Sequence, residues 1–206
     1  MNTFIKVILF LFILSSCDNS TDVNINDSNN LIPLALGNEW RYERAKYRFN
    51  RSDSLTTLSD STSIVMEVVE LDSIGNFSGF KIEHIPFWFS YKPGTRIYYY
   101  KEDGLYYVQS VGLVYPPPEP TEKKLLSFPT SIGDKHSFGS FTIHTIATNE
   151  IVKLFSKTYN CIRYSVSSKD EVVGELWITP SIGIIKSWQY LGVNTYYYYL
   201  TTYNLN

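Results

Sequence analysis

Short runs of strand-forming residues, separated by turns at regular intervals, make up nearly all of the chain after residue 31. The 17 Tyr, 12 Phe and 4 Trp belong, with Val, Ile and Thr, to the residues that favour strands. The sequence therefore predicts an all-β domain over residues 31–206. The predicted strands are Ile64–Leu71, Gly79–Ile85, Arg96–Lys101, Leu105–Ser110, Ser137–Thr148, Glu150–Phe155, Cys161–Ser167, Val172–Thr179, Ile184–Leu191 and Thr195–Tyr203.

The connections indicate how these strands are arranged. Asp103-Gly104 predicts a type I′ hairpin turn, because Asp-Gly tolerates positive φ at both central positions. Phe49–Ser63 is rich in Ser, Thr and Asp and is predicted to be a loop, and the proline-rich stretch Tyr115–Pro120 an extended surface connection. No strand–helix–strand alternation is visible. We expect an antiparallel meander that forms a curved sheet, a half-open barrel or a sandwich.

One pattern occurs twice. The spacing Pro-x-x-x-Gly-Asn-x-Trp-x-Tyr of Pro33–Tyr42 recurs 96 positions later as Pro-x-x-x-Gly-Asp-x-His-x-Phe in Pro129–Phe138. Both copies place a turn before an alternating aromatic run. Duplication of a half-domain, with halves at 31–120 and 121–206, is one explanation. Independent use of the same strand-entry chemistry is the other.

The N-terminus has the pattern of a secretory signal. Lys6 precedes the apolar run Val7–Leu14, which is far shorter than the roughly 20 residues that span a bilayer as a helix. Leu14-Ser15-Ser16-Cys17 resembles the lipobox of bacterial lipoproteins, which implies a signal peptide over 1–16 and lipidation of Cys17. Residues 17–30 are then expected to be a flexible tether with a reach on the order of 20 Å.

Charge and cysteine content limit the function further. Removal of residues 1–16 leaves 17 basic residues (18 minus Lys6) against 20 acidic ones, a net charge of −3, which argues against nucleic acid as a partner. With Cys17 lipidated, Cys161 has no intramolecular disulfide partner and is expected to be a buried structural residue. Asp18 follows the lipidation site; we expect a lipid-anchored envelope protein at the outer membrane, on its periplasmic or surface face.

Two short motifs resemble a family of uncharacterised bacterial lipoproteins. The first is the opening stretch Pro33–Tyr42, and the second is Trp177–Lys186 with its Pro, Gly and β-branched residues. The resemblance runs through most of 31–206, although Ser181-Ile182 departs from the pattern. It implies a shape similar to the half-open β-barrels of the lipoprotein-localisation proteins, in which a curved antiparallel sheet holds an acyl chain. It implies no catalytic residue.

The sequence offers little support for catalysis or metal binding. His84, His136 and His144 form no close ligand pair, although an even spacing lets the last two share a strand face. Four carboxylates are conceivable glycosidase residues, and this hydrolase hypothesis ranks last: Glu67, Glu70, Asp72 and Glu83. We therefore predict a protein that is not an enzyme and that has no cofactor.

Aromatic clusters remain as the candidate recognition elements. Rings in the runs 96–100 and 196–200 point to both faces of the sheet, because consecutive strand residues alternate. The first hypothesis is a non-catalytic module that binds a hydrophobic or lipid-like ligand. The alternative is a structural lipoprotein that docks on an envelope protein or glycan through an aromatic surface. The residues predicted to form the ligand site are Trp40, Tyr42, Tyr98, Tyr100, Trp177, Trp188 and Tyr198.

Overall fold

The computed structural model describes residues 30–50, 55–86, 96–110 and 119–206. The predicted signal peptide, Cys17 and the predicted tether up to residue 29 lie outside these ranges. The described residues form twelve strands and no helix. The strands are β1 (Glu39–Asn50), β2 (Leu55–Ile74), β3 (Phe77–Glu83), β4 (Arg96–Lys101), β5 (Gly104–Gln109), β6 (Thr121–Ser127), β7 (Lys135–Phe138), β8 (Phe141–Leu154), β9 (Lys157–Ser168), β10 (Glu171–Thr179), β11 (Gly183–Leu191) and β12 (Asn194–Asn204).

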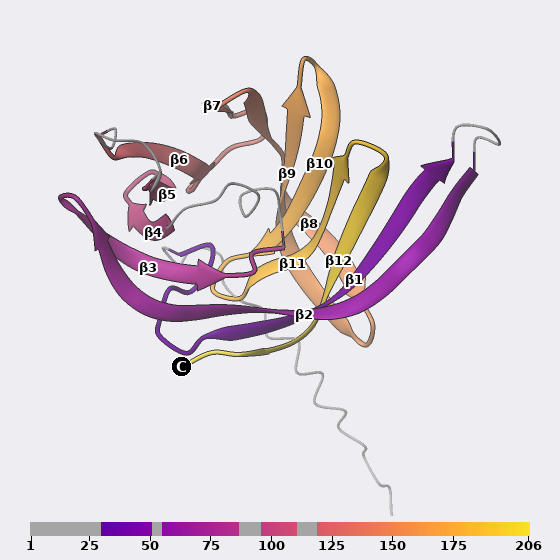
Figure 1. The fold of residues 1–206 in the computed structure, drawn as a ribbon, viewed down its shortest axis with the longest axis horizontal. Helices are drawn as coiled ribbons and strands as arrows, with labels where there is room; N and C mark the ends of the chain where they lie inside the picture. The colour runs from indigo at the N-terminus through magenta and orange to yellow at the C-terminus, as the bar shows by residue number, and fades with distance from the viewer. Residues whose placement is uncertain (1–29, 51–54, 87–95, 111–118) are drawn as a thin grey trace, which may run out of the picture.

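All twelve strands belong to one antiparallel sheet that curls into a nearly closed barrel (Figure 1). The order is β6-β5-β4-β3-β2-β1-β12-β11-β10-β9-β8-β7, so each strand lies beside its neighbours in sequence and β1 pairs with β12. The remaining gap lies between β6 and β7, the two ends of this order. The predicted all-β antiparallel meander is confirmed.

Type I′ geometry occurs at a hairpin turn other than the predicted one. The turn between β9 and β10 has positive φ at Lys169 (50°) and Asp170 (67°), as a type I′ turn requires. The turn between β4 and β5 is Glu102-Asp103, one residue earlier than predicted, because Lys101 pairs with Gly104. Neither turn residue has positive φ, so the predicted type I′ geometry is wrong here. Gly104 has φ 147°, and a Cβ there would lie 2.0 Å from the Leu126 carbonyl oxygen. Close approach of β6 therefore requires this glycine.

Two strand assignments made from the sequence are wrong. Most of the predicted loop Phe49–Ser63 is strand, because β2 begins at Leu55 and pairs with β1 as far as Glu67. Ser and Thr are common in loops, but they also suit a solvent-facing strand. Ser137–Thr148 and Glu150–Phe155 were expected as two strands; β7 ends at Phe138 and one bulged strand, β8, runs from Phe141 to Leu154.

The first described residues close one end of the barrel. Leu31 and Ile32 are buried, and the Tyr100 hydroxyl on β4 accepts a hydrogen bond from the Ile32 amide (2.6 Å) and donates one to its carbonyl (2.9 Å). The Ser181 amide in the β10–β11 turn donates to the Asn30 carbonyl (2.9 Å). We call this end, where β1 starts and β12 finishes, the tether end. The opposite end, with the β9–β10 and β11–β12 turns, is the distal end.

The repeated sequence pattern corresponds to a repeated turn. Gly37 and Gly133 both have positive φ (78° and 97°) and precede β1 and β7. Three backbone hydrogen bonds recur at corresponding positions. In the first turn, the amides of Gly37, Asn38 and Val68 donate to the carbonyls of Val68 (2.9 Å), Ala35 (3.1 Å) and Asn38 (3.0 Å). In the second turn, the amides of Gly133, Asp134 and Thr145 donate to the carbonyls of Thr145 (2.9 Å), Ser131 (3.1 Å) and Asp134 (2.9 Å). The first turn attaches the start of β1 to β2, and the second attaches the start of β7 to β8. Duplication of a half-domain stays a prediction.

Candidate functional site

The inner face of the barrel changes from apolar to polar along β1. Trp40 and Tyr42 are fully buried in the core near the tether end. Arg44 and Lys46 continue the same alternating row towards the distal end, because every second strand residue points to the same face. Along β1, the tether-end half of the inner face therefore belongs to the apolar core, whereas the distal half presents cations.

The paired neighbours of Arg44 and Lys46 extend this polar surface over four strands. In register, Arg44 lies between Thr62 on β2 and Tyr198 on β12, and Lys46 lies between Asp60 and Tyr196. Directly paired residues share a face of the sheet. Tyr198 pairs in turn with Ser187, and Tyr196 with Gln189. We call this surface the distal polar wall, which consists of Arg44, Lys46, Asp60, Thr62, Ser187, Gln189, Tyr196 and Tyr198.

Some polar atoms of the distal polar wall are paired and others are not. Arg44 Nη2 donates to Asp60 Oδ2 (3.1 Å), and Gln189 Nε2 donates to the Tyr198 hydroxyl (3.0 Å). Gln189 is only 4% exposed, yet its Oε1 has no hydrogen-bond partner, and neither has the buried Nε of Arg44. Unpaired buried polar atoms are costly. The wall therefore contains one buried acceptor and one buried donor without a partner.

Cations and aromatic rings lie side by side on the distal polar wall. The Arg44 guanidinium and the Lys46 ammonium each lie 5.9 Å from the centre of the Tyr196 ring. Ser187 Oγ donates to the carbonyl of Pro86 (2.8 Å), which places Pro86 against the same wall. Two cations face one carboxylate, that of Asp60, so the wall carries a net positive charge.

Five of the seven aromatic residues expected at a ligand site lie on the inner face. Trp40 Nε1 donates to the Ile182 carbonyl, and the Tyr42 hydroxyl donates to the Ile184 carbonyl (2.9 Å). Burial raises the pKa of Tyr42 far above its ordinary value and that of Tyr98 to about 12. Tyr100 holds the N-terminal segment, and only Tyr198 belongs to the distal polar wall. Their role in ligand binding stays a prediction.

Trp177 and Trp188 lie on the opposite, outer face, so the structure does not bring the seven aromatics together. Trp177 Nε1 donates to Glu150 (2.8 Å), and Trp188 Nε1 donates to Glu175 (2.8 Å). Arg163 connects the two carboxylates, with its Nη2 2.6 Å from Glu175 Oε1. Its guanidinium and the Lys186 ammonium lie 5.0 and 4.3 Å from the Trp177 ring centre. These tryptophans therefore belong to an outer charged network.

The outer network continues into a row of tyrosines. Tyr197 stacks on Tyr199 (5° between planes) and contacts the edge of Tyr47 on β1, with ring centres 5.5 Å apart. Trp188 on β11 pairs in register with Tyr197. The row Tyr47, Trp188, Tyr197 and Tyr199 is partly exposed, which is the arrangement expected for an aromatic docking surface.

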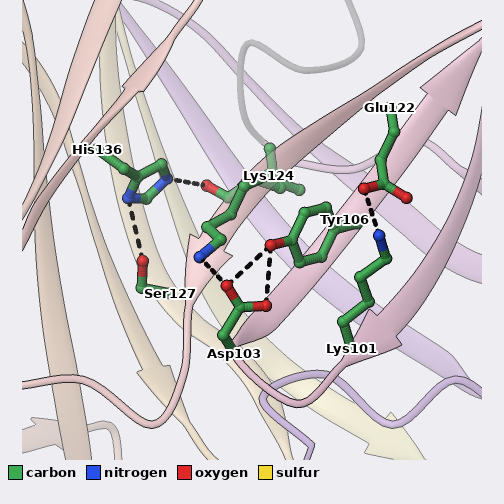
Figure 2. Close-up of polar contacts among 8 residues, drawn as sticks. Lys101, Asp103, Tyr106, Glu122, Lys124, Ser127 and His136 are labelled. Atoms are coloured by element: carbon green, nitrogen blue, oxygen red, sulfur yellow. Dashed lines mark hydrogen bonds and ion pairs between the residues drawn. The ribbon is translucent and has the colours of Figure 1, made fainter.

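A second outer cluster covers β4 to β6 (Figure 2). Asp103 accepts hydrogen bonds from Lys124 and from the Tyr106 hydroxyl (2.8 Å), and Lys101 pairs with Glu122. Lys101 and Lys124 lie 4.9 and 5.5 Å from the Tyr106 ring centre. The Lys124 ammonium and the Tyr106 hydroxyl beside Asp103 lower the pKa of its carboxyl group. Each charge has an opposite neighbour, so this cluster fastens β4, β5 and β6 together.

His136 on β7 bridges the gap between β6 and β7. Its Nε2 lies 3.1 Å from the Leu125 carbonyl oxygen and must donate to it, because a carbonyl only accepts. Nδ1 lies 3.3 Å from Ser127 Oγ and accepts a hydrogen bond from the Ser127 hydroxyl when the ring is neutral (Figure 2). Burial lowers the pKa of His136, and the Leu125 hydrogen bond opposes this effect. The neutral ring therefore joins the two ends of the sheet.

This geometry predicts a pH dependence of stability. The pKa of His136 is lower in the folded chain than its ordinary value of about 6.5, so the unfolded chain binds more protons between the two values. The free energy of unfolding should fall as the pH is lowered from above about 6.5 through the folded-state pKa of His136. In His136→Gln, whose amide keeps a donor for Leu125, urea unfolding should show a smaller fall. An equal fall in both proteins would contradict the assignment.

The other residues that the sequence suggested for catalysis or metal binding lie outside the distal polar wall. His144 on β8 pairs with Lys135 on β7, so its side chain points to the opposite face from His136. The expectation that the two histidines share a face is wrong, because a hairpin turn separates them. Cys161 is buried, and burial raises the pKa of its thiol to about 11, so it is a neutral core residue at pH 7. Glu70 is paired with Lys81 (2.8 Å), and Glu67 lies opposite Glu83. No cluster of metal-binding side chains occurs among the described residues.

Comparison with known proteins shows one structural likeness. No family model matches the chain, and no curated protein matches it in sequence. A solved structure from Parabacteroides distasonis ATCC 8503, described as a "putative lipoprotein", is similar over 86% of this chain and 100% of that one, with 13% identity and a TM-score of 0.32. A likeness at this TM-score carries no argument for function. Within the described ranges, no helix has the length and apolar character needed to cross a membrane.

Proposed function

We propose that this chain is a non-catalytic, lipid-anchored protein of the bacterial envelope that binds a small amphiphilic ligand with an acidic head group. The lipobox-like stretch Leu14–Cys17 supports the anchor. The distal polar wall supports the ligand class, because Arg44 and Lys46 face the barrel interior beside tyrosine rings. The partners proposed are the membrane, reached through the N-terminal lipid, and this ligand. An outer-membrane location remains part of the proposal.

The observation that supports this proposal most directly is the change from apolar to polar residues along the inner face of β1. Core residues Leu31, Ile32 and Trp40 occupy the tether-end half, so a long acyl chain has no room there. The Tyr196 and Tyr198 rings remain for a short apolar part of the ligand. An acidic head group would accept hydrogen bonds from Arg44 and Lys46, and a hydroxyl beside it would satisfy Gln189 Oε1.

A comparison of two arginines on β1 tests the proposal. Arg44 faces inward, whereas Arg41 is 54% exposed and pairs with Glu39 on the outer face. Decanoate supplies an acidic head group and a short tail for calorimetric titration of the full Cys17→Ala chain. Arg44→Met should weaken decanoate binding by roughly 10-fold or more, the value of a charge-assisted hydrogen bond. Arg41→Met should bind like the parent chain. Equal binding by both variants, or an equal loss in both, would overturn the proposal.

The partly exposed row Tyr47, Trp188, Tyr197 and Tyr199 favours a second candidate, an interaction protein that docks on an envelope protein or glycan. This function would depend on the outer face of β1, β11 and β12 and would be insensitive to Arg44→Met. A Trp188→Ala variant that loses crosslinks to envelope components, while retaining decanoate binding, would select it.

A further inference from the structure

The end of the β8–β9 hairpin carries exposed apolar and basic side chains together. Ile151 and Phe155 are 60% and 69% exposed. Lys153 lies between them in the sequence, and Lys157 follows the turn; both are exposed. The segment 151–159 contains two lysines and no acidic residue, in a chain whose formal net charge is −2. We call Ile151, Lys153, Phe155 and Lys157 the hairpin tip.

The conformation of Phe155 is unusual for its residue type. Phe155 has φ 54° in the two-residue turn between the paired residues Leu154 and Lys157. Such positions favour Gly, Asn or Asp, and a bulky residue there is a genuine outlier. Among the five non-glycine residues with positive φ in the described ranges, Phe155 is the only apolar one. The turn thus holds a large aromatic ring out in solvent.

The hairpin tip lies at the tether end of the barrel. Thr179 Oγ1 donates to the Asn160 carbonyl on β9 (3.1 Å), and the turn after Thr179 holds the Asn30 carbonyl through the Ser181 amide (2.9 Å). Asn160 and Asn30 therefore lie at the same level of the barrel. Phe155 is five residues beyond Asn160 (160 minus 155), which corresponds to a projection of up to about 16 Å. In Figure 1, the end of this hairpin and the C-terminus both lie low in the view.

The reach of the preceding chain matches this projection. Asn30 is thirteen positions after Cys17 (30 minus 17), and a flexible coil of that length spans about 20 Å. A lipid on Cys17 would therefore hold the tether end close enough to the bilayer for the hairpin tip to touch its surface. Phenylalanine enters the interfacial region readily, and lysines pair with anionic head groups.

We infer that the hairpin tip docks on the anionic lipid surface of the membrane that anchors the chain. The inference rests on the proposed lipid anchor and adds an orientation: the tether end faces the bilayer and the distal polar wall faces away. Two exposed apolar residues in the distal turns lack this basic setting: Val172 follows Asp170 and Glu171, and Val193 lies between Gly192 and Asn194.

Two single-cysteine labels on the full lipidated chain test this inference. Lipidation consumes Cys17, and Cys161 is fully buried, so a cysteine introduced by Ser156→Cys or by Val193→Cys would carry the label selectively. Val193, 42% exposed in the β11–β12 turn, is the matched position at the distal end. The label is the polarity-sensitive dye NBD, and the vesicles contain phosphatidylethanolamine and phosphatidylglycerol. The mass of the N-terminal peptide is measured on the same sample to establish lipidation.

We expect at least a threefold rise of NBD emission at Ser156, with quenching by spin-labelled lipid, and no change at Val193. Phe155→Asn preserves the turn, because Asn accepts positive φ, and should at least halve the rise at Ser156. Lys153→Glu should weaken it in proportion to the anionic lipid fraction. If the chain is lipidated and the label at Ser156 stays as exposed as that at Val193, the inference is wrong and the lipoprotein proposal stands.

The remaining outcomes separate the two proposals. A chain without lipid whose Ser156 label still enters vesicles would refute the proposed anchor and support the docking tip. A chain without lipid whose label stays exposed would overturn both. A label exposed on vesicles but shielded in whole envelopes would assign the hairpin tip to a protein partner and overturn the inference.

Discussion

Replacement of Trp40 by alanine is expected to lower the free energy of unfolding by about 4 kcal/mol, as for other large-to-small changes in packed cores. Trp40 has no solvent exposure, and its Nε1 donates to the Ile182 carbonyl across the tether end. A Cβ at Gly183 would lie 3.2 Å from that Nε1, so the backbone of β11 already packs tightly against the ring. The alanine variant leaves both a cavity and an unpaired carbonyl. Urea unfolding of the two proteins measures the difference.

Trp188 provides the matched control, since it is the same residue type on the outer face. It is half-buried, and its Nε1 donates to Glu175 (2.8 Å). Trp188→Ala should cost roughly 2 kcal/mol, through one hydrogen bond and partial burial. Equal losses for the two variants would contradict the assignment of Trp40 to the core and of Trp188 to the surface.

Cys17→Ala is expected to abolish incorporation of labelled palmitate in a diderm host and to release the chain from sedimented membranes. The thiol of Cys17 is the group that the lipobox-like stretch Leu14–Cys17 implies as the acylation site. Several acyl chains on one residue anchor a protein stably, whereas a single chain holds it only marginally. Loss of the thiol therefore removes the whole anchor. Label incorporation and membrane sedimentation are measured on the same cultures.

Cys161→Ala is the control for this experiment, because the chain contains two cysteines. Cys161 is buried beside Thr179, with Sγ 3.4 Å from the Thr179 hydroxyl, and its raised pKa keeps the thiol protonated. Its replacement should leave palmitate incorporation at the wild-type level. A Cys17→Ala chain that is still labelled and still sediments would refute the lipoprotein proposal.

Local sequence patterns predicted most of the strands, because alternation and turn residues act over a few positions. The predicted strands Cys161–Ser167 and Val172–Thr179 left residues 168–171 as their connection, and Lys169 and Asp170 have the positive φ of type I′ geometry. The long β2 was missed over Leu55–Ser63 because exposed strands and loops share a Ser/Thr-rich composition. Its strand character comes from pairing with β1, as in Arg44 opposite Thr62.

The candidate site was predicted only in part. The local sequence does indicate the polar part of the inner face on β1, where Arg44 follows Trp40 and Tyr42 in the same alternating row. Gln189 and Ser187 gave no local signal, since their place on the distal polar wall depends on pairing between β11 and β12. Trp177 and Trp188 were grouped with Trp40 because all are aromatic strand residues, yet they lie on the other face.

The sequence by itself determined the all-β antiparallel class, through strand-forming runs and turn residues that act locally, and it predicted the lipid anchor at Cys17. Only the tertiary structure decided which face of each strand is inside. Alternation separates two faces without saying which one is buried when both carry aromatic rings. Burial follows from the closure of β1 on β12, which joins Trp40 to Tyr203 far along the chain. That closure also gathers Arg44, Lys46, Tyr196 and Gln189 on one inner surface.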